Sequence, residues 1–304
     1  MDKLVIRGGH PLFGEVAIAG AKNAALPILC AALLTSEKIV LRNLPDLQDV
    51  RTMLKLLGQM GVFIHFPNPV DRSVLEIQAQ TIDKPEATYD MVKTMRASIL
   101  VLGPLLARFG KAYIPKPGGD KIGRRRLDTH FLGFEKLGAK FQYDAKDTFY
   151  SVDASQLKGT YMLLDEASVT GTANVVMAAV MAKGKTTIYY AACEPYLQQL
   201  CKMLVRMGAK ISGIGSNMLH IEGVSELGGT THRILPDMIE IGSWIGMAAM
   251  TGSEITIKDV SYPDLGIIPT VFRRLGIHTE LRGDDLYIPA HDHYEIESFI
   301  DGSI

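Results

Sequence analysis

The chain has 304 residues, 47% of them hydrophobic, and a formal net charge of −1 at pH 7. This length allows two domains, each with a core of its own. A net charge near zero excludes a protein whose whole surface attracts nucleic acid or anionic lipid, so any preference for anions must be local.

Neither a membrane span nor an export signal is predicted. The longest apolar run, 97–107, is too short to cross a bilayer and has an arginine on each side. The first residues, MDKLVIRGG, contain no apolar signal region. The chain has 3 cysteines without metal-binding spacing, which is typical of a reducing compartment. We therefore expect a cytoplasmic protein.

One pattern of elements occurs four times along the chain. Each copy contains a helix that ends in Leu-Gly or Met-Gly, and the closing glycines lie 77, 70 and 68 residues apart, at Gly61, Gly138, Gly208 and Gly276. Glycine is the common residue after a last helical turn. A regular spacing of this kind predicts structural repeats that pack against one another.

The elements of each repeat follow one order. A helix rich in small residues comes first, predicted at Asn23–Leu34, Val92–Phe109, Asn174–Ala182 and Ile239–Met250. A strand follows, at Lys38–Arg42, Lys111–Ile114, Thr186–Tyr190 and Glu254–Lys258. The glycine-ended helix is next, and two short strands close the unit, as at Ala209–Ser212 and Met218–Glu222. The unit is therefore βαβαββ-like, and its alanine-rich first helix can be buried on all sides.

The most distinctive local sequence is the loop Pro117–Asp128, which reads PGGDKIGRRRLD. Its glycines allow the backbone to approach a ligand closely. Its arginines are suited to bidentate binding of phosphate or carboxylate. Asp120 places an acid among these cations. Taken alone, the same loop is also compatible with a solvated turn.

Three motifs together resemble the enolpyruvyl transferases over essentially the whole chain. They are GAKNAALP at 20–27, KTMRAS at 93–98 and the Pro117–Asp128 loop, and the resemblance is strongest to members that act on UDP-N-acetylglucosamine. It implies an α/β fold of two inside-out α/β barrels, each with three repeats, helices inside and sheets outside.

On this template, 21–235 form a complete first domain with the UDP-sugar site and the catalytic loop. Residues 1–20 and 236–304 form an incomplete second domain, which includes a strand at Lys3–Arg7. We expect part of the active-site cleft to lie beyond residue 304, so that this 304-residue chain has little or no transferase activity. Uncovered apolar surface around Ile239–Met250 would then favour self-association.

The resemblance also implies the reaction. The enolpyruvyl group of phosphoenolpyruvate is transferred to the 3-hydroxyl of UDP-N-acetylglucosamine, with release of phosphate. This is the first committed step of peptidoglycan synthesis, and thereby serves cell-wall formation, cell shape and division. Neither a metal nor an organic cofactor is implied. A non-catalytic UDP-sugar-binding paralogue is the alternative.

The resemblance assigns catalytic residues by position. Lys22 contacts phosphoenolpyruvate, Arg125 touches both substrates, and Asp120 stands where most members carry cysteine as general acid. A raised pKa would allow Asp120 to donate a proton, whereas the neighbouring cations would lower that pKa. Because a carboxylate attacks an epoxide more weakly than a thiolate, we expect insensitivity to the epoxide antibiotic fosfomycin.

The remaining site residues would bind substrate. Asn23 is either a ligand-binding residue or a helix N-cap, and Arg96 is either a nucleotide-sugar ligand or a surface arginine. The loop contributes Arg125, Arg126, Leu127, Asp128, Thr129 and His130, and a second segment contributes Ser168 and Val169. Several of these positions depart from the usual pattern: Arg126 replaces proline, Glu166 replaces lysine, Thr170 is interposed before the glycine, and Leu127 and Thr129 also vary. Asp237 and Glu240 are more simply explained as N-terminal helix carboxylates.

Two rival functions remain from the sequence. The shikimate-pathway enolpyruvyl transferase shares the architecture, but it carries a GSKS-type motif and lacks the KTMRAS helix. The second rival is a nucleic-acid patch built on Arg124–Arg126, against which the neutral net charge and the few interleaved aromatic residues argue.

Overall fold

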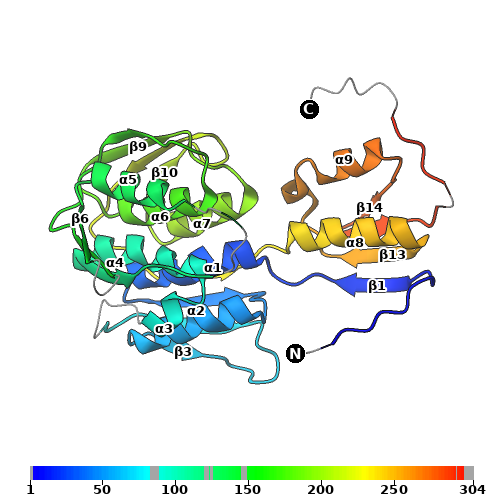
Figure 1. Ribbon diagram of the computed structural model, residues 1–304, viewed down its shortest axis with the longest axis horizontal. Helices are drawn as coiled ribbons and strands as arrows, with labels where there is room; N and C mark the ends of the chain where they lie inside the picture. The colour runs from blue at the N-terminus through cyan, green and yellow to red at the C-terminus, as the bar shows by residue number, and fades with distance from the viewer. Residues whose placement is uncertain are drawn as a thin grey trace. The chain divides into compact units, whose positions relative to one another are not determined.

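The computed structural model describes residues 3–82, 89–119, 123, 126–144, 149–291 and 293–297. The chain divides into two compact units, which are described separately (Figure 1). Unit 1 comprises Met1–Gly20 with Pro236–Ile304, and unit 2 comprises Ala21–Leu235. Among the described residues, no helix combines the length and the apolar character that a membrane crossing requires.

Unit 2 has three sheets in its described part, one for each repeat. The first contains β12 (Thr230–Arg233), β2 (Lys38–Arg42), β4 (Leu75–Gln78) and β3 (Phe63–His65). The second contains β5 (Lys111–Pro115), β7 (Phe149–Asp153) and β6 (Lys140–Asp144). The third contains β8 (Tyr161–Leu163), β9 (Lys185–Tyr189), β11 (Met218–Glu222) and β10 (Lys210–Ser212). The last strand of the unit, β12, pairs in parallel with β2, so the end of the third repeat completes the first sheet.

Helices occupy the centre of unit 2. They are α1 (Lys22–Ala31) with η1 (Ala32–Leu34), η2 (Arg96–Val101) with α4 (Leu102–Phe109), and α6 (Val169–Ala179). From Ala24 to Leu34, and from Gly171 to Ala179, every residue is buried. Their small side chains let the helices approach closely on all sides. The sheets lie around these buried helices. This arrangement, helices inside and sheets outside, confirms the expected inside-out α/β fold.

A second set of helices packs with one face only. These are α2 (Gln48–Gln59), α5 (Asp128–Lys136) and α7 (Pro195–Arg206). In α2, for example, Val50, Met53 and Leu57 are buried, while Arg51 and Lys55 are exposed. The apolar residues recur at helical spacing, so one stripe faces the core.

Unit 1 repeats the same pattern. Its sheet has the order β1 (Phe13–Ala17), β13 (Glu254–Lys258), β15 (Asp285–Ile288) and β14 (Glu280–Arg282). As in the first and third sheets, one strand pair is parallel and the others are antiparallel. Its helices are α8 (Met238–Thr251), η3 (Tyr262–Leu265) and α9 (Ile268–Arg274).

Several predicted boundaries were wrong, each for a local reason. The strand expected at Lys3–Arg7 is absent: residues 3–12 lack regular structure, and β1 pairs with β13 instead. The helix expected at Val92–Phe109 is broken by extended Met95 into α3 (Tyr89–Val92) and η2–α4. The helix expected from Asn174 begins at Val169, because Ser168 caps it.

The close contact between α4 and α6 yields a prediction. A Cβ added to Gly103 would lie 2.3 Å from the backbone oxygen of Asn174. We therefore expect Gly103→Ala to lower the free energy of unfolding by about 1–3 kcal/mol through overpacking, measured by urea denaturation.

A matched control is Gly58→Ala in α2, where the nearest atom to a new Cβ is Ile64 Cδ1 at 3.6 Å. Alanine favours a helix, so this change should be neutral or stabilising by up to about 1 kcal/mol. Equal effects of the two substitutions would contradict the assignment of Gly103 to a close helix contact.

Candidate functional site

The candidate site lies where three helix N-termini of unit 2 meet. The first turn of α5 contacts the segment before α6 through Thr129 and Asp165. The segment before α5 contacts the start of η2 through Arg126 and Arg96. Helix N-termini carry partial positive charge and unpaired N–H groups. This end of the unit is therefore suited to an anionic ligand.

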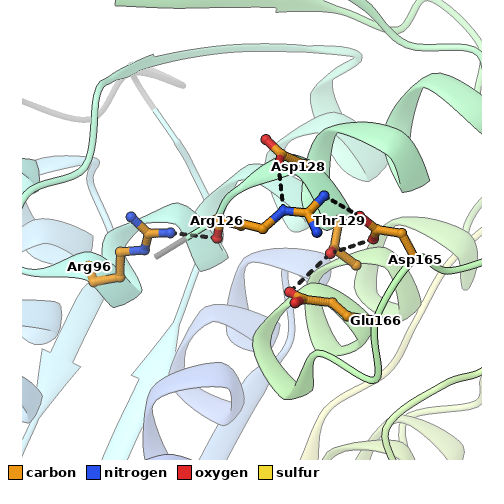
Figure 2. A network of polar contacts seen from close by, with 6 residues as sticks. All are labelled: Arg96, Arg126, Asp128, Thr129, Asp165 and Glu166. Atoms are coloured by element: carbon orange, nitrogen blue, oxygen red, sulfur yellow. Dashed lines mark hydrogen bonds and ion pairs between the residues drawn. The ribbon is translucent and has the colours of Figure 1, made fainter. Parts of the chain in front are cut away.

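A polar cluster occupies this meeting point (Figure 2). Arg126 donates from Nε to Asp128 Oδ2 at 2.7 Å and from Nη2 to Asp165 Oδ2 at 2.5 Å. The Thr129 hydroxyl lies 2.8 Å from Asp165 Oδ1 and 3.2 Å from Glu166 Oε1. The hydrogen bond from Thr129, together with the charge of Arg126, lowers the pKa of Asp165. At neutral pH Asp165 is therefore ionised beside the guanidinium of Arg126.

Arg96 joins this cluster from the adjacent helix. Its Nη2 donates to the backbone oxygen of Arg126 at 2.6 Å, as Figure 2 shows. Arg96 is half-buried and bonds to the protein backbone. Arg96 supports the backbone of the very segment that the sequence assigned to substrate binding.

The glycines that open the loop serve packing within the protein. A Cβ on Gly118 would lie 1.7 Å from the oxygen of Lys93, and Gly119 has a φ of +102°. Their N–H groups donate to the oxygens of Val92 and Lys93 at 3.1 and 3.2 Å. Gly118 and Gly119 therefore pack directly against the backbone of the turn that precedes Arg96. A side chain at either glycine would have no room there.

His130 is buried behind the cluster, with 3% of its surface exposed. Its Nδ1 lies 3.1 Å from Asn174 Nδ2, and its Nε2 lies 3.4 Å from Thr170 Oγ1. An amide nitrogen only donates, so Nδ1 accepts and the proton resides on Nε2. Burial, with the charge of Arg96, lowers the pKa of His130 to about 3. His130 is thus neutral and lies between α5 and α6.

The second predicted segment forms the start of α6. Ser168 is its N-cap, and its Oγ accepts from the N–H of Gly171 at 3.2 Å. Val169 is the first helical residue and is half-buried. A cap of this kind leaves the remaining N–H groups of the first turn directed outward.

Lys22 and Asn23 lie at the start of α1. Lys22 Nζ pairs with Asp49 Oδ2 at 3.1 Å, and both side chains are more than 40% exposed, at 42% and 43%. Such a surface pair contributes little free energy, so Lys22 can exchange Asp49 for a ligand. Asn23 is exposed and is the second helical residue; the N-cap is Ala21, so the N-cap interpretation of Asn23 was wrong.

The structure leaves part of the predicted site undescribed. Asp120 and Arg125 lie outside the described residues. Leu127 is 9% exposed and packs in the core of unit 2. Among the described residues, no group of three or more His, Cys, Asp or Glu side chains is placed to hold a metal ion. In unit 1, Asp237 caps α8 and Glu240 accepts from Trp244, which agrees with their structural interpretation.

Two residues of the site were not predicted. Nothing in the sequence singled out Asp165, although it accepts from both Arg126 and Thr129. Asn174 was treated only as a helix residue, although it is fully buried and bonds to three neighbours. Their partners lie more than 30 residues away in sequence, so spacing alone could not reveal the contacts.

Comparisons with known proteins support the family that the sequence motifs indicated. The sequence model of the family described as EPSP synthase (3-phosphoshikimate 1-carboxyvinyltransferase) matches residues 6–297. The UDP-N-acetylglucosamine 1-carboxyvinyltransferase of Bacteroides fragilis is 61% identical over 308 residues, covering 100% of this chain and 70% of its own. The enzyme of that name from Porphyromonas gingivalis is 59% identical over 306 residues, with the same coverage of 100% and 70%.

Among solved structures, the enolpyruvyl transferase NikO from Streptomyces tendae superposes with a TM-score of 0.83. The match covers 94% of this chain and 68% of NikO, at 20% sequence identity. At that identity the likeness establishes a common fold.

The burial of His130 predicts a specific pH dependence. The unfolded chain takes up a proton below the ordinary histidine pKa of 6.5, whereas the folded protein does so only near 3. Stability present above pH 6.5 is therefore lost as the pH falls towards 3. We expect His130→Gln to reduce the slope of unfolding free energy against pH by about 1.4 kcal/mol per unit between pH 6 and 5.

Urea denaturation of both proteins across this range measures the difference. Other acid-sensitive groups, including Asp165, are common to both proteins and cancel in the comparison. Identical slopes would show that His130 is accessible to protons in the folded state.

Proposed function

Because this chain belongs to the EPSP synthase family and, within it, to the UDP-N-acetylglucosamine 1-carboxyvinyltransferases, we propose that it binds UDP-N-acetylglucosamine and phosphoenolpyruvate and transfers the enolpyruvyl group to the sugar 3-hydroxyl. One observation carries the assignment of the sugar-nucleotide site: Arg96, Arg126 and the N-termini of α5 and α6 meet at one end of unit 2. A diphosphate needs cations and N–H donors in this combination.

The chemistry assigns roles to the catalytic residues. Protonation of C3 of phosphoenolpyruvate makes C2 electrophilic, and we propose Asp120 as the acid that supplies this proton. Lys22, at the start of α1, would bind phosphoenolpyruvate after leaving Asp49, and Arg125 would contact both substrates. The sugar hydroxyl then attacks C2 and gives its proton to a base. Loss of phosphate from C2 together with a proton from C3 restores the vinyl group. None of these steps requires a metal or an organic cofactor.

We further propose that Asn23, Leu127, Asp128, Thr129, Ser168 and Val169 complete the substrate site, with His130 supporting it from the core. The reaction would take place in the cytoplasm as the first committed step of peptidoglycan synthesis, and so bear on cell shape and division. Self-association through α8 is also a proposal, supported by Ile239 and Met250, which are 55% and 88% exposed.

Binding of UDP-N-acetylglucosamine to the purified chain tests the site. We expect Arg96→Ala to weaken binding at least about tenfold in isothermal titration, since a hydrogen bond to a charged group contributes about 1.5–3 kcal/mol. Lys210→Ala is the control, because Lys210 pairs with Glu222 on the outer sheet of the third repeat. Equal loss in both variants would contradict the assigned site.

A transfer assay with phosphoenolpyruvate separates the enzyme from the non-catalytic alternative. Release of phosphate that depends on UDP-N-acetylglucosamine supports the transferase. Binding without phosphate release agrees both with the sugar-nucleotide-binding paralogue and with the low activity expected from the sequence for this 304-residue chain. Acceptance of shikimate 3-phosphate in place of the nucleotide sugar would favour the shikimate-pathway rival.

The acid at position 120 predicts resistance to fosfomycin. A carboxylate is a weaker nucleophile than a thiolate, so incubation with the drug should leave the mass of the protein unchanged. Asp120→Cys should create a site that gains the mass of one drug molecule, as measured by intact-protein mass spectrometry. A covalent adduct on Asp120 itself would overturn the expectation.

A further inference from the structure

The polar cluster joins two segments that lie far apart in sequence. Arg126 and Thr129 come from the start of α5, whereas Asp165 and Glu166 come from the loop before α6 (Figure 2). Asp165 is the member that bonds to both Arg126 and Thr129. Its two carboxylate oxygens are each used, Oδ2 by the guanidinium and Oδ1 by the hydroxyl. Loss of Asp165 would therefore affect both segments.

Arg126 is held in one orientation by this arrangement. Asp128 and Asp165 occupy its Nε and Nη2, and its Nη1 has no hydrogen-bond partner among the described residues. The side chain remains 45% exposed. An arginine fixed along one edge and open along the other is ready to bind an anion, since little rotamer freedom is left to lose.

Thr129 connects Asp165, and through it Arg126, to the protein core. Its residue is 1% exposed, and Gly171 leaves room for its methyl group: a Cβ there would lie 2.9 Å from Thr129 Cγ2. A hydroxyl has one proton, and the 2.8 Å contact to Asp165 is shorter than the 3.2 Å contact to Glu166. Asp165 is therefore the principal acceptor, and Glu166 is the secondary one.

We propose that Asp165 is a positioning residue for the diphosphate of the nucleotide substrate, acting through Arg126 rather than by touching the substrate. This inference rests on the proposed function, because it requires a diphosphate to bind beside Arg126. The hydrogen bonds that anchor Asp165 also keep it ionised, since they lower its pKa.

A positioning role and a purely electrostatic role of Asp165 predict opposite effects of its removal on diphosphate binding. If the charge of Asp165 mainly repels the diphosphate, its removal strengthens binding. If Asp165 mainly orients Arg126, its removal weakens binding. Asp165→Asn distinguishes the two, because asparagine keeps an oxygen for Thr129 but places an NH₂ group against the guanidinium.

We expect Asp165→Asn to weaken the binding of UDP and of UDP-N-acetylglucosamine about tenfold in isothermal titration, the usual range for a charged hydrogen bond. Binding of uridine, which has no diphosphate, should be unchanged. In an Arg126→Gln background, Asp165→Asn should cause no further loss, because the residue through which it acts is already absent. A general structural defect would instead persist in that background and would extend to uridine.

Glu222→Gln is the matched control. Glu222 accepts from Lys210 at 2.7 Å, and that bond lowers its pKa, as the bonds to Asp165 do. It pairs with Lys185, the first residue of β9, which follows the C-terminus of α6, whereas the candidate site lies at the N-terminus of α6. This variant should bind all three ligands like the wild type.

The possible failures are distinct. Absence of UDP-N-acetylglucosamine binding by the wild type would overturn the proposed function and this inference together. Normal binding by the wild type with equal or tighter binding by Asp165→Asn would overturn the inference alone. A loss that is equally large in the Arg126→Gln background would also overturn it.

Discussion

A single buried amide holds the centre of unit 2 together. Asn174 in α6 accepts from the N–H of Gly103 at 2.8 Å and donates to the oxygen of Ile99 and to His130 Nδ1 at 2.9 and 3.1 Å. It is fully buried, so each broken bond would leave an unpaired polar group at a cost of about 1–3 kcal/mol. The amide therefore fixes α4 and α5 against α6, and Gly103 supplies the space that this contact needs.

The position of the candidate site follows from that constraint. Because Asn174 fixes α4 and α5 relative to α6, the start of η2, which leads into α4, comes within hydrogen-bonding distance of the segment before α5, and the start of α5 does so with the segment before α6. The charged side chains there then bond across segments: Arg96 to the backbone at 126, and Arg126 to Asp165. The charged residues of the site therefore rest on a neutral layer that contains Asn174 and His130. Burial keeps His130 uncharged in this layer.

The sequence predicted the repeats better than their boundaries. The strands Lys38–Arg42, Met218–Glu222 and Glu254–Lys258 were predicted to the residue, because alternation and turn glycines are local signals. The family and the inside-out fold were also confirmed. The break at Met95 and the earlier start of α6 depend on tertiary contacts and a cap, which propensity does not encode. Domain boundaries and the roles of individual site residues stay predictions.

The departures at positions 126 and 166 belong to one network. Glu166, an acid where the family pattern has lysine, would repel a diphosphate if it faced the ligand. In the structure Glu166 points to Thr129. The hydrogen bond to Asp128, then the charge of Asp165 and, to a smaller extent, that of Glu166 raise the pKa of Arg126. A cation at 126 and an acid at 166 therefore complement each other. Neither residue can be judged alone, because removing the arginine would leave three carboxylates close together without a balancing charge.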